Sequence, residues 1–198
     1  MYVREYMQTK VVTVTPDTSI EEAEKLMNDF NIRRLPVLEE GKLVGVVTKH
    51  RLKRLELAGP EKVKQIMVKD PVTVTPDTMI MDVALLGQER QIGTFPVVDR
   101  GKLVGIMTAT DIFNIQAQAL GFGKAGLRLH IYESCEGWRL RNMIEIALSH
   151  KANILGLYKL TAPTTEREET ILFLDTAEGP ELINDLRARG YIVEARFR

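Results

Sequence analysis

The sequence contains one unit twice, sixty residues apart, and this duplication restricts the folds that residues 1–120 can adopt. Residues 6–55 align with residues 66–115 without a gap, and about 19 of some 50 aligned positions are identical. The segment VTVTPDTSI returns as VTVTPDTMI, and GKLVGVVT returns as GKLVGIMT. Two copies of so short a unit are too few for a solenoid. The duplication therefore predicts two half-domains packed about a pseudo-two-fold axis, with a pair of related clefts between them.

Both copies carry the same order of secondary-structure signals. Short β-branched runs predict strands, and apolar residues at helical spacing predict helices. In the first copy the predicted elements are a strand at 11–14, a helix at 20–30, strands at 35–38 and 43–47, and a helix from 48. In the second copy they lie at 72–74, 80–89, 95–98, 103–107 and 111–120. This mixture predicts an α+β fold of two β-α-β-β-α repeats.

A different pattern begins after the glycine-rich segment GFGKAG at 121–126, which is typical of a flexible joint. Beyond it, strands are predicted at 127–132, 154–160, 170–174 and 191–195, and helices at 139–150 and 180–187. The resulting βαββαβ order is the ferredoxin-like arrangement. We therefore expect four segments: a first repeat at 1–60, a second repeat at 61–121, a hinge at 122–126 and a further domain at 127–198.

Composition excludes several classes of function. Acidic and basic residues balance at 27 each, so no overall field attracts nucleic acid or an anionic membrane. The charged N-terminus does not resemble a signal peptide, and no apolar run reaches the roughly 18 residues of a membrane span, which predicts a cytoplasmic protein. One cysteine and three scattered histidines predict no disulfide and no metal site. No catalytic motif is recognised, so we expect no catalytic residues and no enzyme activity.

The clearest candidate for binding chemistry follows the last strand of the second copy. Thr108 and Asp111 place a hydroxyl and a carboxylate three residues apart at a strand-to-helix turn. A helix N-terminus attracts phosphate, and a carboxylate can accept hydrogen bonds from the two hydroxyls of a ribose. A purely structural interpretation stays open, in which Thr108 or Thr110 caps the helix and Asp111 complements its dipole.

The repeat, with its short strand, its hydrophobic-Pro-Val strand and its Gly-x-x-Thr-x-x-Asp ending, resembles the CBS domain. Two copies in tandem resemble the CBS pair, or Bateman module, whose cleft commonly binds an adenine nucleoside or nucleotide. The resemblance implies a regulatory ligand, AMP, ADP or ATP, and no catalytic cofactor. Carried onto this sequence, it places Thr108 and Asp111 at the phosphate and ribose. It lines the base pocket with Lys10, Val11, Val12, Ile32 and Pro36.

The related cleft departs from the family pattern. Thr48 is present, but Arg51 stands where the carboxylate is expected, and a guanidinium cannot accept hydrogen bonds from ribose. One complete site is therefore expected rather than two. Arg51 together with Arg33 and Arg34 can gather the phosphates of a diphosphate or triphosphate in the central groove. The alternative is that these arginines form a solvated basic face.

The C-terminal region resembles an ACT domain in its βαββαβ order and in the glycine at its first strand-to-helix turn. The resemblance implies an amino-acid site at Glu136, Gly137 and Trp138, with backbone groups as ligands. Trp138 can instead pack against a neighbouring helix or subunit. A CBS pair followed by such a domain resembles the acetoin-utilisation type of accessory protein.

Together these features predict an allosteric sensor. An adenine nucleotide binds between the repeats, and the hinge relays the change to the ACT-like domain. We expect a homodimer formed through the CBS domains, the ACT-like domain or both, and an unidentified enzyme as the regulated partner. Two alternatives stay open: a dimerisation module without nucleotide, and an amino-acid sensor that uses the ACT-like domain.

Overall fold

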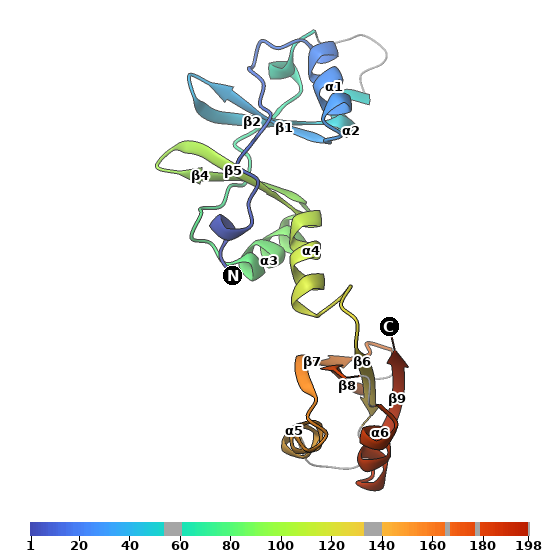
Figure 1. Ribbon diagram of the computed structural model, residues 1–198. Coiled ribbons are helices and arrows are strands. Elements are labelled where there is room, and N and C mark those ends of the chain that lie inside the picture. Colours follow the sequence, from blue (N-terminus) through green and yellow to red (C-terminus); the bar gives the residue numbers. More distant parts are fainter. Residues whose placement is uncertain (54–60, 133–139, 165–166, 177–178, 198) are drawn as a thin grey trace. The chain divides into compact units, whose positions relative to one another are not determined.

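The computed structural model describes residues 1–53, 61–132, 140–164, 167–176 and 179–197. The chain divides into two compact units, Met1–Phe113 and Asn114–Arg198, and the division falls within helix α4 (Ala109–Ala119). Most elements of both units are labelled in Figure 1. In the described ranges, no helix combines the length and the apolar character that a bilayer crossing requires.

The first unit contains the two copies, each built as a helix, a β-hairpin and a second helix. The first copy consists of α1 (Ile20–Asp29), β1 (Arg34–Glu39), β2 (Lys42–Thr48) and α2 (Lys49–Lys53). The second consists of α3 (Ile80–Arg90), β4 (Thr94–Asp99), β5 (Lys102–Thr108) and α4. Short 3₁₀ helices, η1 (Val3–Glu5) and η2 (Val63–Gln65), precede the copies, and β3 (Val68–Lys69) pairs with β2. The predicted hairpins and helices are thus present in both copies.

The hairpin turns follow from the backbone that the turn residues adopt. Glu40 and Gly41 both have positive φ angles, 49° and 77°, and Arg100 and Gly101 repeat them at 48° and 78°. Two consecutive positive φ values favour glycine and suit the twist of a tight antiparallel hairpin. Because both turns are alike, the two hairpins share one register, in which Arg34 pairs with Thr48 and Thr94 pairs with Thr108.

The predicted strands at 11–14 and 72–74 are wrong. In each copy only one residue forms a bridge, Val14 with Val37 and Val74 with Val97. A proline follows two residues later in both copies, and a proline has no N–H with which to continue the pairing. The segments are therefore extended connections rather than strands.

Each of the two segments that precede a copy packs on the other copy. The N-terminal segment packs on the second copy, where Val3 N donates to Thr78 O at 2.9 Å. Residues 61–67 pack on the first copy, where Val63 N donates to Thr18 O at 2.9 Å. Val63 and Ile66 complete the core of the first copy, which otherwise comes from Val14, α1, α2 and the hairpin. The second half-domain is therefore discontinuous in sequence, because it includes the N-terminal segment, whereas the first half-domain is continuous through residues 61–69.

The second unit is a four-stranded antiparallel sheet with two helices. Its elements are β6 (Leu127–Tyr132), α5 (Leu140–Ser149), β7 (Asn153–Thr161), β8 (Glu168–Asp175), α6 (Gly179–Ala188) and β9 (Ile192–Phe197). The strand order is β7-β8-β6-β9. Alternate residues of β6 and β8 join Met143, Ile146, Leu182 and Leu186 of the helices in one core. The assignment of this unit to the ACT family stays a prediction, and Glu136, Gly137 and Trp138 lie outside the described residues.

The glycine-rich segment before β6 is packed against the sheet of its own unit. The guanidinium of Arg128, which is 8% exposed, donates to Gly121 O at 2.7 Å. The same guanidinium lies 4.5 Å from the ring centroid of Phe173 and 5.1 Å from that of Phe122. A Cβ on Gly126 would lie 2.4 Å from the backbone oxygen of Leu174. Both ends of the segment are therefore in close contact with the sheet.

Candidate functional site

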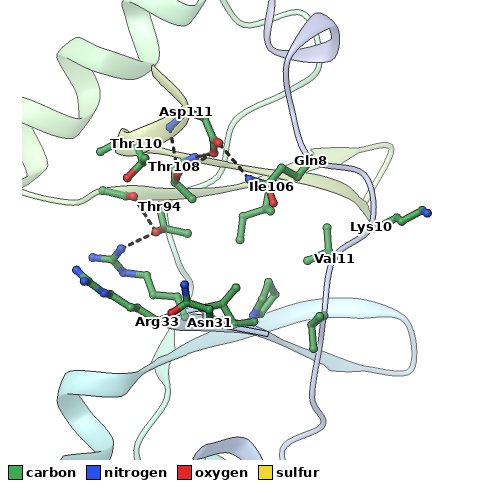
Figure 2. A pocket seen from close by; sticks show the side chains of 16 residues that line it. Gln8, Lys10, Val11, Asn31, Arg33, Thr94, Ile106, Thr108, Thr110 and Asp111 are labelled. Carbon is green, nitrogen blue, oxygen red and sulfur yellow. Dashed lines mark hydrogen bonds between the residues drawn. The ribbon is translucent and has the colours of Figure 1, made fainter. Parts of the chain in front are cut away.

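A cavity of about 550 Å³ lies between the two copies of the first unit (Figure 2). Its volume falls in the range of pockets that bind small molecules, about 300–1,000 Å³. All seven residues predicted for nucleotide binding line it, namely Lys10, Val11, Val12, Ile32, Pro36, Thr108 and Asp111. The structure thus brings together two groups of residues that lie far apart in the sequence.

The Asp111 carboxylate is fixed by the turn that opens α4. One oxygen, Oδ2, accepts from Thr108 N at 2.8 Å and from Thr108 Oγ1 at 2.6 Å. Thr108 Oγ1 in turn accepts from Asp111 N at 3.3 Å. This reciprocal pattern is a capping box, so the structural role considered for these two residues is present. Capping orients the carboxylate along the cavity wall, and the two roles are therefore compatible.

Gln8 holds the other oxygen of the same carboxylate and was not predicted from the sequence. Its Nε2 donates to Asp111 Oδ1 at 3.0 Å (Figure 2). The backbone of Gln8 exchanges two hydrogen bonds with Ile106, at 3.0 and 2.9 Å, which fixes its position beside β5. The sequence contained one sign of this role: Gln8 aligns with the apolar Val68 in the second copy, so a polar residue stands at only one of the two equivalent positions. A ligand hydroxyl that approaches Asp111 competes with the Gln8 amide.

The opposite wall of the cavity is mainly apolar and comes from the first copy. Val11, Val12 and Ile32 are partly buried and Pro36 is buried, so their side chains form a stable surface. Lys10 is exposed, and Figure 2 shows its side chain pointing away from the centre of the cavity. This wall can pack against a flat aromatic ring, with backbone groups near Lys10 free to contact the ring edge.

Two guanidinium groups enter the same cavity. Arg33 and Arg34 were expected with Arg51 at the second cleft, but both line the cavity that contains Asp111. Arg34 Nη1 donates to Thr94 Oγ1 of the other copy at 2.7 Å. Desolvation by the cavity walls, and then the positive charge of Arg33, lower the pKa of Arg34. The cavity therefore combines one carboxylate with an adjacent pair of cations.

Thr48 and Arg51 do not line this cavity. Thr48 Oγ1 accepts from Arg51 N at 3.4 Å, as Thr108 does from Asp111, so the start of α2 copies the start of α4. The Arg51 side chain turns to the backbone, where Nη1 donates to Ile66 O at 3.3 Å. This arginine therefore ties α2 to the residues after η2, and it is not gathered with Arg33 and Arg34.

Comparison with protein families and relatives gives a consistent match to the duplicated part of the chain. A family model of the CBS domain matches residues 3–57 and 63–117, more than half of the chain. Inosine-5′-monophosphate dehydrogenase of Korarchaeum cryptofilum is 41% identical over 104 residues, which cover 52% of this chain and 22% of that protein. Protein MJ0188 of Methanocaldococcus jannaschii is 36% identical over 145 residues, covering 70% of this chain and 52% of that protein. The chain thus matches only part of the length of these relatives.

Solved structures of similar fold include CBS pairs. The structure of CBSX2 in complex with AMP aligns with a TM-score of 0.56 and 29% identity, covering 59% of this chain and 96% of that chain. The CBS domain pair of MJ0100 in complex with 5′-methylthioadenosine and S-adenosyl-L-methionine aligns with a TM-score of 0.57 and 29% identity, covering 60% and 97%. AcuB of Vibrio cholerae aligns with a TM-score of 0.56 and 28% identity, covering 61% and 93%. On its duplicated sequence, its paired half-domains and these matches, the chain belongs to the CBS-domain family and contains a tandem CBS pair.

Proposed function

We propose that this chain is a regulatory sensor that binds an adenine nucleotide of the AMP, ADP or ATP class between its CBS domains. The observation that carries the proposal is the cavity in which Asp111 and Thr108 face the apolar wall of Val12 and Ile32. Complexes of similar CBS pairs with AMP and with S-adenosyl-L-methionine support an adenosyl ligand. Catalysis is not part of the proposal.

In this proposal the parts of the nucleotide meet different walls of the cavity. The adenine ring packs between Val12 and Ile32, where burial of its apolar faces favours binding. The ribose hydroxyls donate to Asp111 and displace the Gln8 amide from Oδ1. The phosphates then lie near Thr108 and the start of α4, where backbone N–H groups favour an anion.

Isothermal titration calorimetry with AMP, ADP, ATP and S-adenosyl-L-methionine tests this proposal, repeated with Asp111→Ala. Each hydrogen bond lost from the carboxylate is expected to weaken binding by about 10- to 150-fold, because charged hydrogen bonds contribute about 1.5–3 kcal/mol. Arg51→Ala is the matched control, because position 51 is equivalent to position 111 but lies outside the cavity. Its affinity is expected to stay within about twofold of the unsubstituted protein.

Two results contradict the proposal. A dissociation constant that Asp111→Ala leaves unchanged moves the nucleotide away from this cavity. If none of the four ligands gives a heat of binding, with folded protein free of bound nucleotide, the result favours an assembly module or an amino-acid sensor. Asp111→Ala also removes a helix cap, so circular dichroism must show that the variant keeps its fold before its affinity is compared.

The sensor further requires that occupancy of the cavity alters the C-terminal unit. We propose that α4 carries this effect, because Asp111 lies at its start and the glycine-rich segment follows its end. Amide chemical shifts of residues 127–132 and 168–176 are expected to change on nucleotide addition. Unchanged shifts at saturation remove the relay from the proposal while leaving nucleotide binding intact. A homodimer, with an enzyme as the regulated partner, remains part of the same proposal.

A further inference from the structure

One hydrogen bond joins the two CBS domains at equivalent positions. Arg34 opens β1 and Thr94 opens β4, and they occupy the same place in their copies, sixty residues apart. Arg34 Nη1 donates to Thr94 Oγ1 at 2.7 Å, and Thr94 Oγ1 donates its own proton to Gly93 O at 2.8 Å (Figure 2). The Thr94 hydroxyl is therefore oriented as an acceptor for the guanidinium. The bond spans the line along which the two domains meet.

The same guanidinium lines the nucleotide cavity with a charge that is not neutralised. Among the residues that the structure describes, neither Arg33 nor Arg34 forms a salt bridge. Asp111 is the one carboxylate among the residues that line the cavity. Its Oδ2 accepts from Thr108 and its Oδ1 accepts from Gln8, so neither oxygen is paired with an arginine. A partly buried cation whose hydrogen-bond partner is a neutral hydroxyl gains more from an anion than from that hydroxyl.

The guanidinium borders the cavity beside Gly93, which also lines it. Gly93 stands at the position of Arg33 in the second copy, and a Cβ there would lie 3.9 Å from both terminal nitrogens of Arg34. The same Cβ would lie 3.4 Å from Ala109 Cβ, so the gap at Gly93 is small, and a ligand reaches Arg34 from the cavity that both residues line. Asn31 and Thr110 also line this part of the cavity and supply neutral polar groups. The surroundings therefore suit an anionic tail rather than a cationic one.

We propose that Arg34 determines ligand specificity in this cleft and exchanges between Thr94 and a ligand phosphate. The inference rests on the proposed nucleotide function and deepens it. A phosphate offers a charge-assisted bond roughly twice as strong as the bond to a neutral hydroxyl, so binding releases Thr94. Phosphorylated adenosines are thereby selected over S-adenosyl-L-methionine, whose sulfonium is repelled by the arginine pair. Loss of the Arg34–Thr94 bond also changes the contact between the two CBS domains.

Calorimetry with ADP and with adenosine separates this role from general binding, because adenosine lacks the phosphates. For Arg34→Met, which keeps an apolar wall, ADP is expected to bind about 10- to 150-fold more weakly, while adenosine stays within about twofold. For Thr94→Val, which removes the competing acceptor, ADP is expected to bind about two- to tenfold more tightly, with adenosine again unchanged. Arg51→Met is the matched control, because its guanidinium contacts Ile66 O outside the cavity.

The outcomes distinguish the two proposals. If neither adenosine nor ADP binds the unsubstituted protein, the nucleotide function fails and this inference fails with it. If both bind and Arg34→Met leaves the ratio of their affinities unchanged, the role of Arg34 alone is refuted. An equal loss for both ligands also refutes it, because the arginine then acts only on the fold. Arg34→Gln, which keeps a donor for Thr94 without the charge, repeats the test if Arg34→Met fails to fold.

Discussion

Replacing Gly121 with alanine is expected to destabilise the C-terminal unit much more than the same change at Gly123. Both glycines have positive φ angles, 73° and 85°, so alanine is strained at either position. Their surroundings differ. A Cβ on Gly121 would lie 2.4 Å from two ring carbons of Phe173, whereas no described atom lies within 4 Å of a Cβ on Gly123. Phe173 is 1% exposed and packed against Arg128, so its ring has little room to move.

The difference between the two variants isolates the clash. A left-handed backbone costs alanine about 1–2 kcal/mol, and the stiffer unfolded chain returns about 0.4–1 kcal/mol, which leaves a net loss of about 1 kcal/mol for Gly123→Ala. Overpacking of a filled site adds about 1–3 kcal/mol, so Gly121→Ala is expected to lose about 2–4 kcal/mol. In a unit of this size each kcal/mol lowers the melting midpoint by about 4–8 °C.

Differential scanning calorimetry of the full chain measures both midpoints. Hydrogen exchange of the amides in β8 then assigns the affected transition to the C-terminal unit. We expect the midpoint of Gly121→Ala to lie at least about 4 °C below that of Gly123→Ala. Equal midpoints would refute the packing argument. They would mean that residues 121–126 leave Phe173 in solution and behave as the free joint that their composition suggests.

Three further predictions concern single contacts. Arg128→Met removes the charged donor to a buried backbone oxygen and is expected to cost about 1.5–3 kcal/mol in urea unfolding, and an unchanged midpoint contradicts this. Leu35→Ala, at a fully buried position, is expected to cost about 2–5 kcal/mol and to lower only the calorimetric transition of the CBS unit. Hydrogen bonds from Lys64 and then Lys62 lower the pKa of Asp17 below its ordinary value of 3.8. The interaction of the Asp17 carboxylate with these lysines therefore stabilises the fold fully above about pH 3.8, and this stabilisation is lost as the pH falls through the lowered pKa of Asp17. Unfolding at a series of acidic pH values should show a shallower loss for Asp17→Asn, and an identical pH dependence would exclude the contribution.

Secondary structure in the two copies was predictable where the signal is local. The hairpins follow from paired apolar runs around Glu40-Gly41 and Arg100-Gly101, whose positive φ angles the turn requires. The start of α1 follows from Ser19, whose Oγ accepts from Glu22 N at 3.1 Å. The strands predicted at 11–14 and 72–74 fail because β-branched composition does not reveal whether a partner strand can pair beyond one residue.

The candidate site was predictable only in part. Thr108 and Asp111 are three residues apart, so helix geometry alone places them together at the start of α4. Gln8 was missed because its partner lies 103 residues away, and no local pattern marks a glutamine for that contact. Arg34 was assigned to the other cleft, since its neighbours in sequence do not disclose which copy it faces.

The sequence by itself determined that the chain has two equivalent units, where their hairpins and helices begin, and which turn carries a paired hydroxyl and carboxylate. Only the tertiary structure decided which preceding segment joins which copy. Met7 and Met67 are identical, as are Gly45 and Gly105, so the sequence allows either pairing. In the structure a Cβ on Gly105 would meet Met7 and a Cβ on Gly45 would meet Met67. Packing of the N-terminal segment on the second copy brings Gln8 to Asp111. Helix and strand periodicity can be read from neighbouring residues, but close packing between distant segments leaves no local pattern in the sequence. Only the tertiary structure therefore reveals this contact.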